Sequence, residues 1–113
     1  MKRSPRPFTR LLAAGAGVLA LGACTPQAYI DQVFGEHAGE ATRVAECESG
    51  MDPTAVSAGG GNHGLFQINN VHRTQFQEVT GQPWQAVYHP FFNAEFAKWL
   101  YDQEGWRPWA CRP

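Results

Sequence analysis

The chain has 113 residues, including nine basic residues, ten acidic residues and three cysteines, so it is long enough for one domain at most. Four of the basic residues but none of the acidic ones precede residue 24, so residues 24–113 carry five basic and ten acidic side chains, a net charge of −5. This acidic balance argues against nucleic acid as a partner.

Residues 1–23 are typical of an export signal. The basic residues come first, Lys2, Arg3, Arg6 and Arg10, and an apolar run from Leu11 to Ala23 follows. This run is too short to span a bilayer as a permanent helix. It ends in Leu21-Gly22-Ala23-Cys24, which resembles a bacterial lipoprotein lipobox. The resemblance implies cleavage before Cys24, lipid on Cys24, and an exported chain anchored to the membrane on its extracytoplasmic side. An ordinary signal peptide is the alternative.

The odd number of cysteines fits this interpretation. If Cys24 carries lipid, Cys47 and Cys111 remain, and an oxidising compartment lets them pair. A bridge across a loop of roughly 65 residues would contribute about 4 kcal/mol in the chain-entropy picture. The alternative is a zinc site that adds His63 and His72. No pair among these four residues has zinc-finger spacing, so we expect neither a metal nor a cofactor.

Residues 24–27 are expected to form a short linker, followed by helix from Ala28 to Glu48. Apolar side chains recur there with a helical period, and charged ones lie on the other side. Gly35 and Gly39 weaken the first half, so two helices are an alternative. Gly50 and Pro53 end the helical pattern, which places Glu48 in the last turn or just after it.

Residues 57–64, SAGGGNHG, are expected to form a glycine-rich loop, which lacks the lysine of a phosphate-binding loop. The apolar LFQI at residues 65–68 is expected to be extended, and GQPWQ at residues 81–85 to turn.

Two further helices are expected in the second half of the chain. Asn69 or Asn70 can cap a helix that runs to about Val79 and ends at Gly81. His89-Pro90 can open a last helix that ends at Gly105. The fold class is therefore expected to be mainly α, with a glycine-rich loop or a minimal β insert and one disulfide.

Three segments taken together resemble the lytic transglycosylase (SLT) domain of the lysozyme-like superfamily. They are Glu48-Ser49-Gly50, Asp52-Pro53-Thr54-Ala55-Val56-Ser57 and Gly64-Leu65-Phe66-Gln67-Ile68. The resemblance covers residues 28–113 and implies a small lysozyme-like helical domain. It also implies cleavage of the MurNAc–GlcNAc β-1,4 bond, so the partners would be peptidoglycan glycan strands and, through the lipid, the membrane. The sequence indicates no particular protein partner.

The family's residue roles are carried over position by position. Glu48 matches the single catalytic glutamate, and Ser49 matches a serine that helps to position it. Phe66 and Gln67 match residues that line the sugar groove, and Asn93 matches an asparagine near the glutamate. Each of the last three could instead serve a small core.

The chain departs from the family pattern at several positions. His89 stands where the D-P-x-x-N segment of the family has its aspartate. Leu100 stands where many members have an active-site tyrosine. The stretch GGGNH at residues 59–63 lacks the common G-A-M. These departures concern substrate contacts more than the acid. His63 lies in the loop that faces the expected groove, where it could contact substrate, and the four tryptophans could stack on sugars or fill the core.

Cleavage of a glycosidic bond needs an acid that protonates the leaving oxygen. A carboxyl group at a helix C-terminus beside apolar side chains is disfavoured as an anion, which suits Glu48 to the role of acid. In the transglycosylase reaction one glutamate suffices, because the acetamido group of the substrate assists. Asp52 is therefore expected to be a turn residue. A hydrolytic lysozyme and a non-catalytic wall-binding lipoprotein are the alternative functions.

Overall fold

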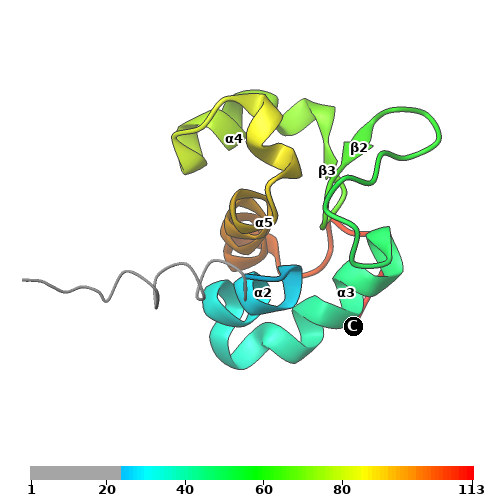
Figure 1. Cartoon of the computed structure of the whole chain (residues 1–113), viewed down its shortest axis with the longest axis vertical. Helices are drawn as coiled ribbons and strands as arrows, with labels where there is room; N and C mark the ends of the chain where they lie inside the picture. Colours follow the sequence, from blue (N-terminus) through cyan, green and yellow to red (C-terminus); the bar gives the residue numbers. More distant parts are fainter. Residues whose placement is uncertain (1–23) are drawn as a thin grey trace, which may run out of the picture.

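The computed structural model describes residues 24–113, a mainly helical domain (Figure 1). The elements in chain order are α2 (Pro26–Phe34), η1 (Gly35–His37), α3 (Ala38–Ser49), β2 (Asn62–His63), β3 (Ile68–Asn69), η2 (Asn70–His72), α4 (Arg73–Thr80), η3 (Trp84–Tyr88) and α5 (Pro90–Glu104), where η marks a 3-10 helix. The expected signal peptide at residues 1–23 lies outside the described residues. Among the residues that are described, no helix is long and apolar enough to cross a membrane.

The segment expected to be helical from Ala28 to Glu48 is two α-helices, which confirms the second alternative. Gly35 has φ +56°, a backbone conformation that favours glycine, and α2 ends there. The short η1 turn then redirects the chain into α3. Gly50 closes α3 in the left-handed conformation, with its N–H bonded to the carbonyl groups of Ala45 and Glu46. Glu48 therefore lies in the last turn of α3, as expected.

The glycine-rich loop belongs to a minimal antiparallel hairpin. Asn62 pairs with Asn69, and His63 pairs with Ile68. The expectation of an extended LFQI holds only for Ile68, because residues 64–67 form the tight turn of the hairpin. This turn needs positive φ at both ends, +79° at Gly64 and +52° at Gln67.

The second half of the chain follows the expected caps. The Asn69 side chain accepts the Val71 N–H at the start of η2, and Gly81 ends α4. Residues 84–88, expected in part to be a turn, form the 3-10 helix η3. His89 caps α5 by accepting the Phe91 N–H at Nδ1, with Pro90 in the first turn. The histidine thus performs the capping role that an aspartate would perform.

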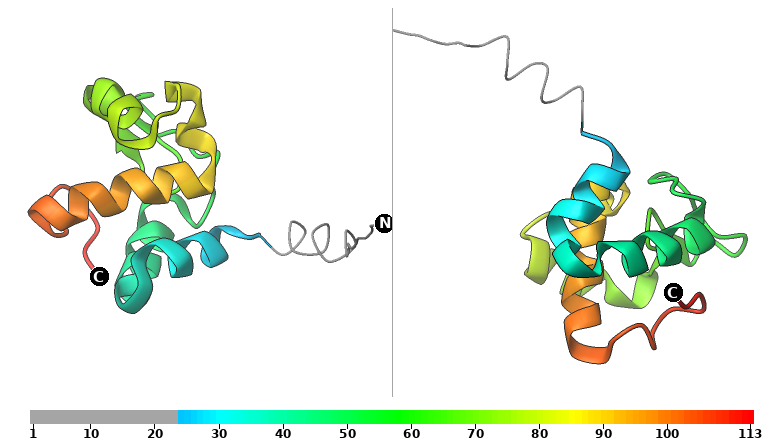
Figure 2. Two further views of the ribbon diagram at one scale, coloured as in Figure 1. Left: turned by 90° about the vertical axis from the view of Figure 1, so that its left-hand side faces the viewer. Right: turned by 90° about the horizontal axis from the view of Figure 1, so that it is seen from below.

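The core is built around α5, which crosses the middle of the domain (Figure 2). Helix α2 packs on one side of it, and α4 and η3 pack on the other. The large side chains that are fully buried include Phe66, Phe76, Phe96, Ile30, Leu65, Val44 and Val87. The C-terminal tail leaves α5 and returns to the end of α3 (Figure 1).

The predicted disulfide is confirmed. Cys47 on α3 is bonded to Cys111 in the tail, with a Cα–Cα distance of 6.0 Å and a sequence separation of 64. The bridge holds the tail beside the last turn of α3, next to Glu48.

Candidate active site

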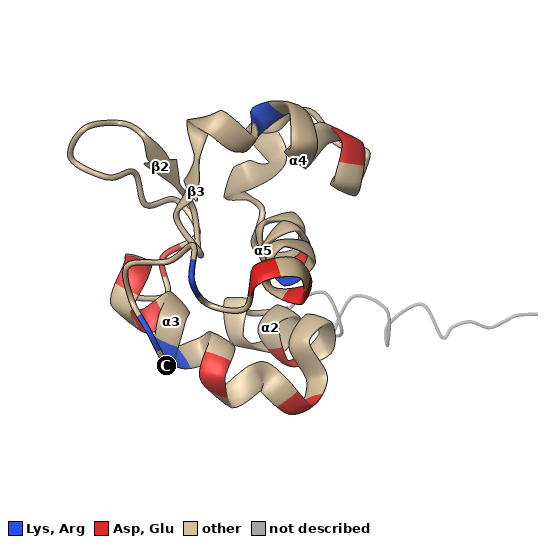
Figure 3. Cartoon of the chain, turned by 180° about the vertical axis from the view of Figure 1, so that it is seen from behind, with Lys and Arg blue, Asp and Glu red and all other residues tan. Residues whose placement is uncertain are grey.

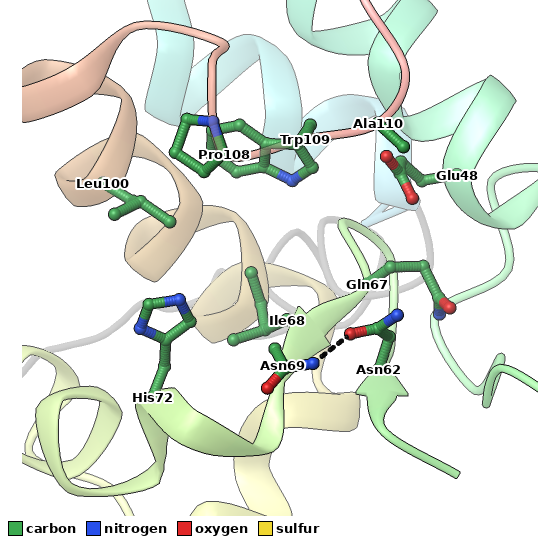
Figure 4. A pocket seen from close by; sticks show the side chains of 10 residues that line it. All are labelled: Glu48, Asn62, Gln67, Ile68, Asn69, His72, Leu100, Pro108, Trp109 and Ala110. Atoms are coloured by element: carbon green, nitrogen blue, oxygen red, sulfur yellow. Dashed lines mark hydrogen bonds between the residues drawn. The ribbon is translucent and has the colours of Figure 1, made fainter. Parts of the chain in front are cut away.

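A cavity of about 340 Å³ lies between the hairpin and the C-terminal tail (Figure 4). Its volume falls in the range of small-ligand sites, roughly 300–1,000 Å³. The lining residues are Glu48, Asn62, Gln67, Ile68, Asn69, His72, Leu100, Pro108, Trp109 and Ala110. The residues from Asn62 to His72 form one wall, here called the hairpin wall, and residues 108–110 form the other, the tail wall. Glu48 and Leu100 contribute from α3 and α5.

Glu48 is half-buried at one end of the cavity, beside Ala110 (Figure 4). The N–H of Cys111 donates to Oε2 of Glu48, with an N···O distance of 3.1 Å. Because Cys47 precedes Glu48 and is bonded to Cys111, the carboxylate is fixed by a covalent link and a hydrogen bond from the same tail residue. Of the residues that line the cavity, Glu48 is the one with a carboxylate.

The tail wall is anchored by Trp109, which belongs to it, and by Trp106, which precedes it. Trp109 is buried, and its Nε1–H donates to the carbonyl oxygen of Phe66 at 2.9 Å. Trp106 packs against Trp109 with a centroid distance of 5.2 Å, and its Nε1–H donates to Oε1 of Glu40 at 2.9 Å. The indole of Trp109 thus presents an aromatic surface to the cavity from a fixed position.

Ser49 lies outside the cavity and ties α3 to the hairpin. Its Oγ is within hydrogen-bonding distance of the carbonyl oxygens of Ala45 (3.1 Å) and Leu65 (2.7 Å). It also accepts the N–H of Asp52 at 3.3 Å. The serine therefore sets the distance between the helix end that carries Glu48 and the turn that carries Gln67.

Phe66 and Asn93 lie in the core and do not line the groove, so the core alternative is the correct one for both. The Phe66 ring is fully buried between Phe34 and Trp109. Asn93 is also fully buried: Oδ1 accepts the N–H of Phe66 (2.8 Å), and Nδ2 donates to the carbonyl oxygens of His63 (3.1 Å) and Val87 (2.8 Å). Both side chains support the hairpin wall from the side of the core.

Gln67 does line the cavity, but its amide also holds the loop before it. Nε2 donates to the carbonyl oxygens of Ala55 (3.2 Å) and Gly64 (3.0 Å). These bonds offset the cost of a positive φ at a residue that is not glycine. Gly64 itself has no room for a side chain, because a Cβ there would overlap with Nδ2 of Asn93 and the carbonyl oxygen of Val87.

His63, which could have contacted substrate, does not line the cavity. His63 is buried, with Nδ1 2.7 Å from Oη of Tyr88 and Nε2 2.7 Å from Oδ1 of Asn70. His72 lines the cavity in its place, and its Nδ1 lies 3.1 Å from Oε1 of Gln75. The motifs gave no signal for His72, Asn62 or Asn69, because their approach to Glu48 depends on the register of a two-residue hairpin.

Comparison with known proteins agrees with this geometry. A family model described as a lysozyme-like domain matches residues 16–111. The chain belongs to the lysozyme-like domain family. No curated protein and no solved structure matches the chain. Membership of this family means that the domain has the fold of peptidoglycan-related glycosidases and transglycosylases.

The other carboxylates of the lysozyme-like domain lie outside the cavity lining. Oδ1 of Asp52 accepts hydrogen bonds from the hydroxyl group (2.7 Å) and the backbone N–H (2.8 Å) of Thr54. Both bonds lower the pKa of Asp52, and the bond from the hydroxyl group has the larger effect. Asp52 is thus a turn residue, as expected. Burial raises the pKa of Glu95 on α5, whose Oε1 is buried without a partner among the described residues.

The charged residues of the lysozyme-like domain avoid the hairpin wall. Between Asp52 and Arg73 the sequence has no Asp, Glu, Lys or Arg, and Figure 3 shows the hairpin without charged positions. Within residues 24–113, no group of three or more His, Cys, Asp or Glu side chains is arranged to hold a metal ion. The hairpin wall can therefore recognise a ligand through neutral hydrogen bonds and shape.

Proposed function

We propose that this lysozyme-like domain is a lytic transglycosylase that cleaves the MurNAc–GlcNAc β-1,4 bond of peptidoglycan, with Glu48 as acid and then base. The observation that carries the proposal is the single carboxylate in the cavity lining. Most glycosidases need two carboxylates, and substrate assistance is one of the known exceptions. A site with one glutamate therefore fits a substrate that brings its own nucleophile, as N-acetylated amino sugars do.

The proposed reaction has two steps. The protonated carboxyl group of Glu48 donates its proton to the glycosidic oxygen, and the acetamido carbonyl oxygen of MurNAc attacks the anomeric carbon as the C–O bond breaks. The carboxylate of Glu48 then removes the proton from the C6 hydroxyl, whose oxygen displaces the acetamido oxygen. The product is a 1,6-anhydro sugar, and Glu48 regains its proton.

The scaffold supports this use of Glu48 at two points. The Cys111 N–H bonded to Oε2 restrains the side chain, which general acid catalysis requires. The Trp109 indole and the apolar side chains of Ile68 and Leu100 line the same cavity. An aromatic face and aliphatic side chains can pack on the apolar faces of sugar rings while excluding water.

We also propose that the protein acts outside the cytoplasm as a lipoprotein. Cys24 is exposed and lies two residues before α2 begins, so a lipid there would place the domain next to the membrane surface. Metabolic labelling with a fatty acid tests this. Label on the unsubstituted chain and none on Cys24→Ser supports the anchor, whereas label on neither removes it.

Product analysis tests the proposed reaction. Purified protein is incubated with peptidoglycan sacculi, and the soluble fragments are weighed by mass spectrometry. Fragments with an anhydro end, one water lighter than hydrolysed ones, are the expected result. Hydrated fragments would instead indicate a lysozyme on the same scaffold. Binding of sacculi without soluble fragments would indicate a wall-binding lipoprotein.

A further inference from the structure

Asn62 on the hairpin wall is held by both its backbone and its side chain. Its N–H donates to Oγ of Ser57 at 3.0 Å, and its carbonyl oxygen accepts the N–H of Ser57 at 3.0 Å. Across the hairpin it pairs with Asn69. Nδ2 of Asn69 donates to Oδ1 of Asn62 at 2.8 Å, while Oδ1 of Asn69 accepts the Val71 N–H at 3.0 Å. A chain of hydrogen bonds thus fixes the Asn62 amide in one orientation.

This orientation decides which group the ligand meets. Because Oδ1 of Asn62 is bonded to Asn69, the group left for a ligand is the Nδ2 donor. In the view of Figure 4, Nδ2 lies on the Glu48 side of the Asn62–Asn69 bond, across the cavity from Trp109 and Ala110. No charged residue shares the hairpin wall. The wall therefore offers a neutral, preorganised donor.

We propose that Asn62 is a specificity-determining residue that donates Nδ2–H to an acetamido carbonyl oxygen of the glycan. A hydroxyl group can both donate and accept, but a carbonyl oxygen can only accept. The acetamido carbonyl is such an acceptor on every ring of an N-acetylated amino-sugar polymer. A donor with its own oxygen already bonded thus fits this group better than it fits a hydroxyl.

The acetamido group that Asn62 binds belongs to a ring next to the one that is cleaved. In the proposed reaction the cleaved ring needs its carbonyl oxygen as the nucleophile, and a hydrogen bond to that oxygen would weaken the attack. The inference rests on the proposed substrate class. It concerns binding, however, so it does not require that Glu48 cleaves the polymer.

Binding of two matched oligosaccharides tests the inference. Calorimetry on the full chain compares an N-acetylated β-1,4-glucosamine oligomer with its de-N-acetylated form. The unsubstituted protein is expected to prefer the acetylated oligomer. Loss of one neutral hydrogen bond in Asn62→Ala is expected to weaken that binding about 3- to 10-fold, with no change for the de-N-acetylated oligomer.

Asn62→Asp gives the sharper result. It keeps an oxygen to accept from Asn69, so the hairpin is preserved. Its carboxylate repels the acetamido carbonyl but attracts the ammonium group of the de-N-acetylated sugar, so the preference between the two oligomers is expected to reverse. Gln32→Glu on the exposed side of α2 makes the same amide-to-acid change away from the cavity and is expected to keep the original preference.

Several outcomes would overturn the inference. If Asn62→Ala weakens the binding of both oligomers equally, with an unchanged melting temperature, Asn62 does not recognise the acetyl group. An Asn62→Asp variant that keeps the acetylated preference would mean the same. If the unsubstituted chain binds neither oligomer, the inference is wrong. If binding behaves as expected but sacculi yield no fragments, the inference stands and the proposed cleavage fails.

Discussion

The two walls of the cavity are held in different ways. The hairpin wall is supported from the side of the core by Asn93, whose amide forms hydrogen bonds with the backbone of Phe66, His63 and Val87. The tail wall depends on contacts between distant parts of the chain, above all the bridge between Cys47 and Cys111. Buried hydrogen bonds therefore shape one wall, and a covalent link positions the other beside Glu48.

Removing the disulfide is expected to have the largest effect. Cys111→Ser opens a link between residues 64 apart, which corresponds to about 4 kcal/mol of unfolding free energy in the chain-entropy picture. Because the tail also orients Glu48, we expect the cleavage rate to fall even at temperatures where the variant stays folded. Urea unfolding and the rate on sacculi measure the two effects.

Cys24→Ser is the matched control for the disulfide, since it also replaces a cysteine but leaves the bridge intact. Its unfolding midpoint is expected to stay much closer to that of the unsubstituted protein, because the covalent link remains. A Cys111→Ser variant with full activity at low temperature would show that the tail wall holds its position without the bridge.

Gly64→Ala tests the hairpin wall. The added Cβ would overlap with the Asn93 amide and the Val87 carbonyl oxygen, at a residue with φ +79°. We expect a loss of about 3 kcal/mol in unfolding free energy from strain and overpacking. Gly60→Ala is the control, because Gly60 has φ +74° but open space around its Cβ position. It is expected to lose only about 1 kcal/mol. Equal losses at both positions would mean that the close fit of Gly64 on Asn93 contributes nothing.

Glu95→Gln is expected to have the smallest effect, and it touches neither wall. Burial raises the pKa of Glu95, so the folded state holds its proton more tightly than the unfolded state does. This residue's contribution to stability is thus largest below its ordinary pKa, and it is lost as pH rises toward the raised value. At pH 7 the variant is expected to gain about 0.5 kcal/mol, or roughly 3 °C in melting temperature.

The gain from Glu95→Gln is expected to vanish near pH 3, where both proteins carry a neutral side chain. Glu78→Gln, at an exposed position of α4, serves as the control and is expected to melt unchanged. A Glu95→Gln variant that melts lower than the parent at pH 7 would contradict the assignment of burial as the cause.

Sequence reasoning succeeded where local signals decide the structure. The helix ends at Gly50 and Gly81, the His89-Pro90 start of the last helix and the disulfide are confirmed. It left open whether Phe66 lines the groove or fills the core, because a motif residue near an active site can also act by packing beneath it. Asn62 and His72 were missed because the turn at residues 64–67 and the strand register bring them to the cavity, and neither is visible in the spacing.

The most direct test of the account compares two glutamates on one helix. Glu48→Gln removes the proposed acid, whereas Glu46→Gln makes the same change at an exposed position two residues earlier in α3. The release of soluble fragments from sacculi is expected to slow about 100- to 10,000-fold for Glu48→Gln and to be unchanged for Glu46→Gln, with both variants melting normally. Equal rates for Glu48→Gln and the parent protein would contradict the central claim that Glu48 supplies the proton.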